Sequence, residues 1–380
     1  MKKTLSLLLA GVIAISTLSW CSNISTSQNK WPEIIKIWVI APLSWPAANY
    51  WEDAVSAYKY VVDKFNSENS WKTQIELVIE DWKCDWKTAS SAAQKLISID
   101  KVQTIVGWIC SVETIPAWKI AQANQVAMIA PVSSAAEIAN IWEYIFRYRN
   151  DANVTKKLSD YLNNSNVKKL FILTENTDYG IGYTQWVKDN FKGTIVEEKY
   201  QSDEKDFNIL AKKVMNSDSD AVLVVTNSDS NTINMYRAFE KQWVLEKLKW
   251  NIYWTELTVS DSVIKELGSL LNWVKATNLI SMEELWERAK TFMEEFSINN
   301  TTLSAPLRIV LEAEGMKLTI DSAVKVWNNG TAVKNYFTNF NANNPRKWYF
   351  GNYYFTPERD AHGLEFLVYE IQDGKLINWK

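Results

Sequence analysis

The sequence predicts an α/β protein built from two similar units, each a parallel β-sheet flanked by helices. Short apolar runs alternate along the chain with longer segments of helical spacing, which is the pattern of strand–helix–strand units. The alternation restarts near residues 146–153 (FRYRNDAN), so we expect the chain to cross there from one unit to the other. A length of 380 residues is enough for two domains of ordinary size.

Hydrophobic periodicity defines the elements of the first unit. Residues 34–43 form a short apolar run, predicted as a buried strand, and residues 50–69 carry apolar side chains at the spacing of one helical face. The same criteria predict strands at 73–81, 102–107 and 126–132 and helices at 88–99 and 111–124. A further helix start is expected in SSAAEIANI, where Ser134 and Glu137 have the spacing of a capping box.

The second unit repeats this pattern. Strands are predicted at 168–176, 194–201, 221–227 and 249–254, and helices at 180–192, 207–217 and 232–242. A long helical region, 283–340, follows, and an aromatic strand pair, YFGNYYF and LEFLVYEI, closes the chain. We therefore assign two composite domains: residues 34–150 with about 281–345 as the first lobe, and 151–280 with about 346–380 as the second.

Tryptophan and glycine occur in unusual numbers, 20 and 11. Glycine normally makes up about 7% of a chain, so about 27 would be expected here. Trp71, Trp82 and Trp86 lie in polar turn sequences where glycine is the usual choice. Trp243 and Trp250 fall where a helix should stop, the place for a left-handed glycine. We hypothesise that most of these tryptophans are glycine in the native protein, encoded by UGA codons.

The most suspect positions are Trp20, Trp38, Trp45, Trp51, Trp82, Trp108 and Trp254. The alternative is a chain that is truly rich in tryptophan, with aromatic platforms for binding sugars. Platform residues would have no reason to gather at turns and helix ends, which favours the glycine hypothesis. The codons separate the two interpretations, because UGG at these positions would exclude glycine.

The N-terminus has the layout of an export signal. Two lysines precede an apolar run at 5–18 that is too short to span a bilayer. Cys21 follows, as in a bacterial lipoprotein signal, and glycine at position 20 would supply the small residue that normally precedes the lipidated cysteine. We expect residues 1–20 to be a signal peptide and 21–33 a tether. The protein would then be an exported lipoprotein, anchored to the outer face of the cell membrane or in the periplasm.

Charge and cysteine content limit the possible partners. The net charge is −3, with 41 basic and 44 acidic residues and no concentrated basic patch, so no nucleic-acid partner is expected. Cys84 and Cys110 form an even pair in an exported chain, and we expect a disulfide between them. On the chain-entropy model, closing that loop would stabilise the fold by about 3–4 kcal/mol. Two free thiols are the alternative.

The residues needed for catalysis are scarce. His362, in a probable turn, is the only histidine, which argues against a histidine-based triad and a multi-histidine metal site. Paired carboxylates such as Glu175 and Asp178 are expected to be solvated charges. We therefore predict that the protein is not an enzyme and takes no cofactor and no metal.

Serines follow two of the predicted strands. Ser111 stands just past the strand at 102–107, and Ser133 and Ser134 follow the strand at 126–132. Ligands of open parallel sheets bind at the carboxyl ends of the strands, and helix N-termini there favour an anion such as a carboxylate. The alternative interpretation is that these serines only cap their helices.

With glycine read for tryptophan, residues 36–66 resemble the opening of the periplasmic receptors for branched-chain amino acids. These are type I substrate-binding proteins of ABC importers, with a two-lobed Venus flytrap fold. Five further segments match in order over nearly all of the mature chain: CDWKTASSAAQKLI, VGWICSVETIPA, IAPVSSAAEIA, TENTDYGIGYTQ and IYWTELT. As written, the tryptophans break the Ser-Gly-Pro and Gly-Gly signatures of that family.

The resemblance implies roles for residues of the first lobe. Ser111 matches the serine that binds the ligand carboxylate directly after a disulfide cysteine, and Cys84 and Cys110 match the disulfide pair. Val132 would offer its carbonyl to the ligand ammonium. Ser134 takes the place of a threonine that binds the carboxylate through its N–H and hydroxyl.

The resemblance also implies roles for further residues of the cleft. Glu256 matches the acidic residue that pairs with the ligand ammonium, and Tyr50 and Tyr179 match aromatic residues that close over the ligand. Asn227 stands where the family often has an aromatic residue, so this chain would accept a more polar ligand side chain.

These implications give one expected function and three alternatives. The expected function is a monomeric, lipid-anchored receptor whose lobes close on an amino acid and signal occupancy to a membrane permease. One alternative is a sensor or receptor of the same fold for another small amide or carboxylic acid, which would leave Glu256 without an ammonium partner. An enzyme and a tryptophan-based carbohydrate binder are the others; the first lacks a nucleophile–base pair, and the second depends on the codons.

Overall fold

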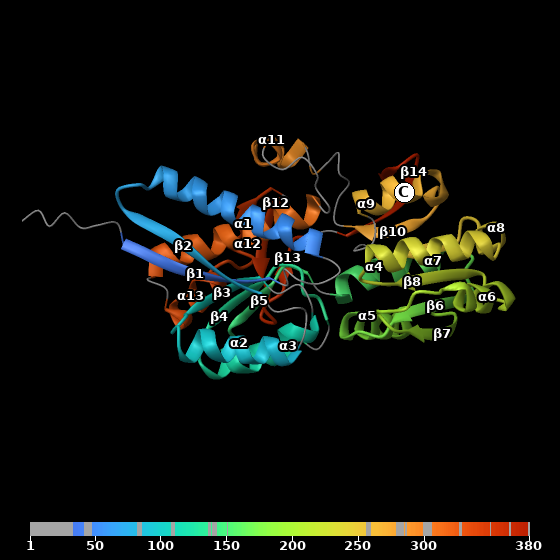
Figure 1. Cartoon of the computed structure of the whole chain (residues 1–380), viewed down its shortest axis with the longest axis horizontal. Coiled ribbons are helices and arrows are strands. Elements are labelled where there is room, and N and C mark those ends of the chain that lie inside the picture. Colours follow the sequence, from blue (N-terminus) through green and yellow to red (C-terminus); the bar gives the residue numbers. More distant parts are fainter. Residues whose placement is uncertain are drawn as a thin grey trace, which may run out of the picture.

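The computed structural model has two lobes side by side along the long axis (Figure 1). The structure describes residues 33–41, 48–81, 86–107, 111–135, 138, 143–149, 151–255, 260–278, 285, 287–298, 306–326, 329–349, 351–364 and 366–378. Each lobe is built around one mainly parallel sheet with helices packed on it, as predicted.

The sheet of the first lobe has the strand order β2-β1-β3-β4-β5, and every neighbouring pair is parallel. Its strands are β1 (Glu33–Ala41), β2 (Thr73–Asp81), β3 (Thr104–Gly107), β4 (Ala127–Ala130) and β5 (Ile145–Arg147). The linking helices are α1 (Ala48–Glu68), α2 (Trp86–Ser98) and α3 (Ser111–Ala123). β3 and β4 are buried along their whole length, because helices cover both faces of a parallel sheet.

The sheet of the second lobe has the order β15-β14-β10-β9-β8-β6-β7. Its parallel strands are β6 (Lys169–Glu175), β7 (Thr194–Tyr200), β8 (Ala221–Val225), β9 (Ile252–Trp254) and β10 (Lys275–Asn278). The antiparallel strands β14 (Leu367–Gln372) and β15 (Lys375–Asn378) extend it. Its helices are α4 (Asp151–Asn164), α5 (Asp178–Asn190), α6 (Asn208–Asn216), α7 (Asp229–Lys241), α8 (Val244–Leu248), α9 (Asp261–Leu267) and the 3-10 helix η3 (Gly268–Leu271).

The expected long helical region consists of separate helices. They are α11 (Lys290–Ser297), α12 (Pro306–Val326) and α13 (Gly330–Thr338). α12 packs against α1 and β3, and α13 packs against α12 and β4, so both belong to the first lobe. α12 is buried on nearly every side, which explains why apolar residues occur all round this helix rather than as one stripe.

The two aromatic strands at the end of the chain do not pair with each other, contrary to our expectation. β12 (Gly351–Phe355) joins a small sheet with β11 (Arg346–Trp348) and β13 (Ala361–His362), so His362 lies in a short strand rather than a turn. Phe355 packs edge-on against Phe146, with ring centroids 5.0 Å apart, so this segment rests on the first lobe. β14 instead joins the second sheet, where it pairs with β10 and β15; Figure 1 shows β12 in the first lobe and β14 in the second.

Most predicted elements are present within a few residues of their expected bounds, and the chain passes from the first sheet to the second within 146–153, since β5 ends at Arg147 and α4 begins at Asp151. Our prediction missed the short elements β5, β10, β11, β13, β15, α8 and α9, and the longer helix α4. β5 and β10 are only three and four residues long, and α4 has few apolar side chains. Glu137 of the expected capping box lies outside the described residues, and residues 133–135 are not helical.

Two tryptophans have the backbone conformation that glycine favours. Trp243 follows the end of α7 with φ 63° and ψ 19°, as expected for a left-handed residue, and Trp273 has φ 79°. The expectation for Trp250 is wrong, because Lys249, with φ 41°, is the residue of positive φ at that helix end. Trp86 begins α2 rather than lying in a turn.

Buried tryptophans add a second observation. Within the described part of the chain, the indole Nε1 groups of Trp38, Trp118 and Trp254 have no hydrogen-bond acceptor although all three side chains are buried. A buried N–H without an acceptor is unfavourable, and a tryptophan in the left-handed region is strained. Both observations are expected if glycine stands at such positions in the native protein, which we propose.

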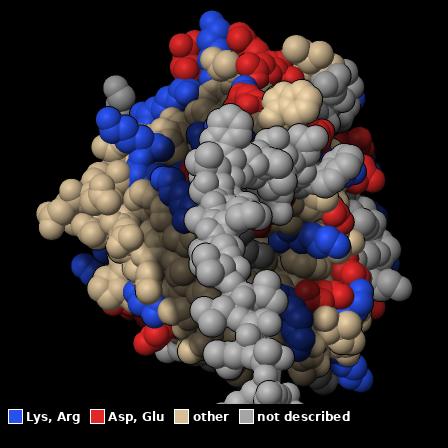
Figure 2. All heavy atoms as spheres, turned by 90° about the vertical axis from the view of Figure 1, so that its left-hand side faces the viewer, with Lys and Arg blue, Asp and Glu red and all other residues tan. Residues whose placement is uncertain are grey.

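On the end of the first lobe, lysine and arginine side chains are interspersed with aspartate and glutamate in the part that is not grey (Figure 2). Among the residues that the structure describes, none of the helices is both long and apolar enough to cross a bilayer.

Candidate functional site

Three serines meet at the edge of the first sheet where its strands end. β3 ends at Gly107 and β4 at Ala130, and the chain continues from these ends into α3 and into the loop of residues 133–135. Neighbouring parallel strands bring their carboxyl ends to one edge. The hydroxyl groups of Ser111 and Ser133 are therefore only 3.4 Å apart. We call Ser111, Ser133 and Ser134 the serine cluster and residues 133–135 the serine loop.

Hydrogen bonds tie the serine loop to the start of α3. The Ser111 hydroxyl accepts from the Ala135 N–H at 3.3 Å, and the Ser133 hydroxyl donates to Thr114 Oγ1 at 3.0 Å. Ser111, Ser133 and Ser134 are all buried. The bond from Ser111 to the serine loop goes beyond capping its own helix, the alternative that the sequence left open.

The serine cluster has the chemistry of an anion site. It combines hydroxyl groups with the N-terminus of the 13-residue helix α3, whose first-turn N–H groups carry partial positive charge. Val132 is buried directly after β4, at the position from which a main-chain carbonyl could accept from a ligand. A carboxylate is an anion of suitable size, because one or two hydroxyl donors and a helix N-terminus can satisfy its oxygens.

An arginine lies behind the serine loop. The Nη1 group of Arg147 donates to the Ser134 carbonyl at 3.2 Å and to the Ala135 carbonyl at 2.7 Å. Its Nε and Nη2 groups donate to the Asp360 carboxylate, and the Nη2–Oδ2 distance is 3.1 Å. The sequence analysis did not single out either residue, because their partners lie far away in the chain.

The second lobe presents Tyr179 and Asn227 at its own strand ends. Tyr179 is buried in the first turn of α5, which Thr177 caps, and its ring centroid lies 5.7 Å from that of Tyr183. Asn227 is half-buried just after β8. α5 packs against α3, so Tyr179 and the start of α3 belong to helices that meet across the lobes.

Glu175 is buried, and the prediction that it is solvated is wrong. It ends β6 with 1% of its surface exposed. Its Oε2 atom accepts from the Thr226 hydroxyl at 3.0 Å and from the Asn227 N–H at 2.7 Å. The carboxylate is satisfied by the next strand end, which a sequence pattern does not reveal. Asp178, its expected pair, is exposed as predicted.

Charged groups from both lobes gather around Arg308, which is buried in the first turn of α12. Burial lowers the pKa of Arg308, and nearby acidic or phenolic groups act in the opposite direction: Glu312, Asp229, Asp53 and Tyr179. Asp229 begins α7 of the second lobe and accepts from the Ser260 hydroxyl at 2.9 Å. The lobes therefore interact through charges on α12 and α7. No sequence pattern indicated this cluster, because its members come from distant segments.

Several predicted site residues cannot be placed. Glu256, Cys21, Cys84 and Cys110 lie outside the described residues, as does the segment that carries the expected tether. Tyr50 lies in α1, but its side chain is outside the described part. The disulfide, the lipidation and the ammonium partner therefore stay predictions.

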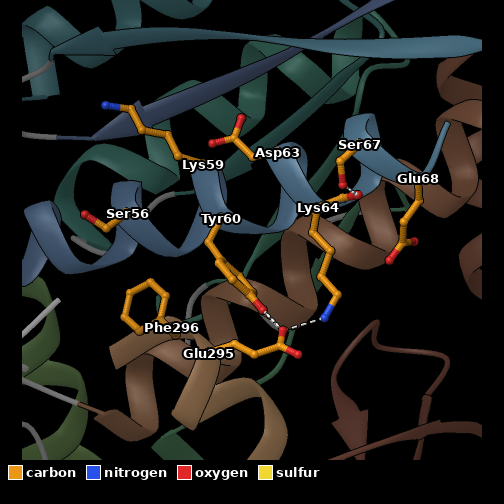
Figure 3. Close-up of a pocket in the computed structure, with 9 residues that line it drawn as sticks. All are labelled: Ser56, Lys59, Tyr60, Asp63, Lys64, Ser67, Glu68, Glu295 and Phe296. Atoms are coloured by element: carbon orange, nitrogen blue, oxygen red, sulfur yellow. Dashed lines mark hydrogen bonds and ion pairs between the residues drawn. The ribbon is translucent and has the colours of Figure 1, made fainter. Parts of the chain in front are cut away.

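A separate groove of about 650 Å³ lies between α1 and α11. Figure 3 shows Tyr60 and Lys64 of α1 pointing toward Glu295 of α11. The Lys64 Nζ–Glu295 Oε2 distance is 2.6 Å, and the Tyr60 hydroxyl also donates to Glu295. These contacts join the two helices beside the core, because the Tyr60 ring also packs against Phe292 and Phe296 of α11. No cluster of potential metal ligands occurs among the described residues.

A periplasmic binding protein family model matches residues 34–287. The chain is similar to the Leu/Ile/Val-binding protein of Escherichia coli strain K12, at 26% identity over 223 residues, 57% of this chain and 58% of that protein. It is also similar to the leucine-, isoleucine-, valine-, threonine- and alanine-binding protein of Pseudomonas aeruginosa, at 28% identity over 48% of this chain and 51% of that protein. The chain thus spans little more than half the length of these curated relatives.

Solved structures share the fold over nearly the whole chain. A leucine binding protein from Thermotoga maritima matches with a TM-score of 0.79 at 16% identity, covering 91% of this chain and 98% of that one. A solute binding protein from Rhodopseudomonas palustris in complex with 4-hydroxybenzoate matches with a TM-score of 0.80 at 19% identity, covering 92% and 96%. At such identities the likeness concerns the fold alone.

Proposed function

The chain belongs to the periplasmic binding protein family, in the type I group of branched-chain amino acid receptors, and we propose that it is a lipid-anchored receptor for an amino acid. The receptor would stand outside the cytoplasmic membrane and deliver its ligand to an ABC importer. The observation that carries this proposal is the buried serine cluster at the strand ends of the first lobe, beside the helix N-terminus of α3.

In this proposal the first lobe binds the ligand first. The hydroxyls of Ser111 and Ser134 and the N–H of Ser134 receive the carboxylate, and Ser133 holds the hydroxyl of Ser111 in place. The carbonyl of Val132 accepts from the ammonium group, and the carboxylate of Glu256, from the second lobe, also accepts from it once the lobes close. A zwitterion needs both halves of this arrangement, because either charge would be unfavourable in a cleft without a partner.

The second lobe completes the site. Tyr179 and Asn227 stand on the second lobe and Tyr50 on the first, so a ligand between them touches both lobes. Contacts made only in the closed form shift the equilibrium toward closure. Closure would then report occupancy to a permease. Asn227 favours a neutral amino acid whose side chain carries a polar group. Threonine is such an amino acid, and the names of two curated relatives include it.

The remaining elements of the proposal come from the sequence. Cys21 would carry the lipid anchor, residues 21–33 would tether the receptor, and Cys84 and Cys110 would form a disulfide. We expect the receptor to act as a monomer and to need no cofactor, since zwitterion binding requires only hydrogen bonds and charge.

A thermal-shift screen tests the proposal. The protein from residue 22, with glycine at the suspect tryptophan positions, is heated with each standard amino acid, with sugars and with carboxylic acids. A ligand at 100 times its dissociation constant adds about 2.7 kcal/mol and raises the melting temperature by several degrees. We expect shifts with a few neutral amino acids only, and their loss in Glu256→Gln. Shifts with sugars alone would refute the amino-acid receptor.

A receptor for a simple carboxylic acid is the second candidate. The serine cluster provides donors for a carboxylate whether or not the ligand has an ammonium group, and one structural neighbour holds 4-hydroxybenzoate. Glu256 separates the two candidates. Glu256→Gln should weaken binding of an amino acid, whereas it should strengthen binding of a benzoate by removing an unpaired negative charge.

A further inference from the structure

Two of the segments that cross between the lobes lie close to the serine loop; the chain also crosses once more, between β10 of the second sheet and α12 of the first lobe. β5 ends at Arg147, four residues before α4 of the second lobe begins at Asp151. At the last crossing, Asp360 precedes β13, and the chain then enters β14 of the second sheet at Leu367. Arg147 and Asp360 are therefore charged residues of the first lobe that lie within a few residues of these two crossings.

The two crossing segments are joined by a buried ion pair. The side chains of Arg147 and Asp360 are 2% and 11% exposed, and the guanidinium donates hydrogen bonds to the carboxylate from two of its nitrogens. The main chains also meet, because the Arg147 N–H donates to the Arg359 carbonyl at 3.1 Å. A planar guanidinium suits this fork-like contact, and a lysine ammonium could not reproduce it.

The opposite edge of the same guanidinium holds the serine loop. Its Nη1 group donates to the carbonyls of Ser134 and Ala135 at 3.2 and 2.7 Å. Ala135 in turn donates its N–H to the Ser111 hydroxyl. A continuous chain of contacts therefore runs from Asp360 through Arg147 and the serine loop to Ser111.

We propose that Arg147 is a positioning residue that Asp360 orients, and that it fixes the serine loop in its ligand-binding shape while linking that shape to the two crossing segments. The proposal rests on the proposed function insofar as the serine cluster binds a ligand. A rotation of the lobes would change the backbone of these two segments and of the third connection, between β10 and α12, because together they join the two sheets. A movement of either crossing segment would therefore shift the serine loop, because the rigid, planar guanidinium of Arg147 contacts both.

The charge and the planar shape of the Arg147 guanidinium let it hold both Asp360 and the serine loop in fixed positions. A charged hydrogen bond is about twice as strong as a neutral one, and a rigid planar donor set fixes direction as well as distance. Replacing Asp360 by asparagine keeps the size of the side chain but removes its charge, so the guanidinium loses its orienting partner. Arg147→Lys keeps the positive charge and removes the fork.

The test uses the full-length protein and three variants: Asp360→Asn, Arg147→Lys and the control Glu314→Gln. Glu314 and Arg346 form an arginine–carboxylate pair of the same kind in the first lobe, 2.6 Å apart and similarly buried, that does not contact the serine loop. The first readout is amide hydrogen exchange of ligand-free protein over residues 131–138. The second is calorimetric affinity for L-leucine.

We expect exchange at 131–138 to become about tenfold faster in Asp360→Asn and Arg147→Lys, with β6 unchanged, and L-leucine to bind about tenfold more weakly, equal to about 1.4 kcal/mol. The control should change neither. Unchanged exchange at 131–138, or faster exchange throughout the protein, would overturn the positioning role.

The two readouts also separate this proposal from the proposed function. If the parent protein does not bind L-leucine, L-leucine is excluded as the ligand of the proposed receptor, while the exchange measurement still decides whether Arg147 holds the serine loop. If exchange at 131–138 accelerates but the affinity for L-leucine stays that of the parent, the link between loop shape and ligand binding is refuted.

Discussion

The two lobes hold the loops at their strand ends with charges of opposite sign. In the first lobe the Arg147 guanidinium donates to two carbonyls of the serine loop. In the second lobe the Glu175 carboxylate accepts from the Asn227 N–H and the Thr226 hydroxyl. Carbonyls need a donor and N–H groups an acceptor, so the sign of each buried charge follows from which backbone groups its loop turns inward.

The lobes also differ in how far these contacts reach along the chain. Glu175 and Asn227 are 52 residues apart and belong to neighbouring strands of one continuous segment. Arg147 and Asp360 are 213 residues apart, so the first lobe depends on a C-terminal segment that leaves for the second lobe directly afterwards. The second lobe can hold residues 226–227 with a carboxylate from the same continuous segment. The first lobe can hold the serine loop through Arg147 and Asp360 only when the C-terminal segment is also in place.

Removal of the charge in the first lobe should have the largest effect. Arg147→Met leaves the Asp360 carboxylate buried without its partner, and we expect a loss of about 3–5 kcal/mol in the free energy of unfolding. Urea denaturation measures it. The double variant Arg147→Met/Asp360→Leu should recover part of the loss, since no charge then stays unpaired. A loss below about 1 kcal/mol in the single variant would show that the Arg147–Asp360 pair contributes little to the stability of the first lobe.

The first lobe should also carry a pH-dependent stability. Burial raises the pKa of Glu312 to about 7, although the Tyr58 hydroxyl and Arg308 oppose the shift. A raised pKa favours the folded state below the unfolded value near 4.5, and this contribution disappears as the pH rises through 7. Between pH 4.5 and 8 the parent should lose about 3 kcal/mol relative to Glu312→Gln. Parallel pH profiles of the two melting temperatures would contradict this.

Neutralising the charge of the second lobe should have a smaller effect. Glu175→Gln keeps one acceptor oxygen for Thr226 and Asn227, so we expect a loss of about 2 kcal/mol in the free energy of unfolding. Thr226→Val, which removes one of the two donors, serves as the comparison and should lose about 1 kcal/mol. Chemical denaturation measures the free energy of unfolding of both variants. If Glu175→Gln proved as damaging as Arg147→Met, the contrast between the lobes would not hold.

The smallest effect concerns a tryptophan of the second lobe. Trp243 is 67% exposed and left-handed, so Trp243→Gly should stabilise the protein by about 1 kcal/mol. Trp71, in the first lobe, is 91% exposed without a positive φ, and Trp71→Gly should not stabilise. Melting temperatures test both. Peptide mass spectrometry of the protein from its own organism, or UGA codons at these positions, would establish glycine independently.

Sequence periodicity was sufficient for the elements that bury a continuous apolar run. β6 and β8 were found to within two residues, because a parallel strand covered by helices needs apolar side chains on both faces. It failed for β10, which is short and begins with the buried Lys275, and for the pairing of β12 and β14. The aromatic character of those strands indicates burial but does not say against which sheet.

The sequence by itself determined the two α/β units, their crossing and the three serines at strand ends, since these follow from local spacing and from the rule that parallel strands share an edge. Only the tertiary structure decided which charges are buried. Glu175 and Asp360 look like ordinary surface carboxylates in the sequence, yet both are held inside by donors from distant segments. A charge can be buried only where its partners converge, and that convergence is a property of the folded chain.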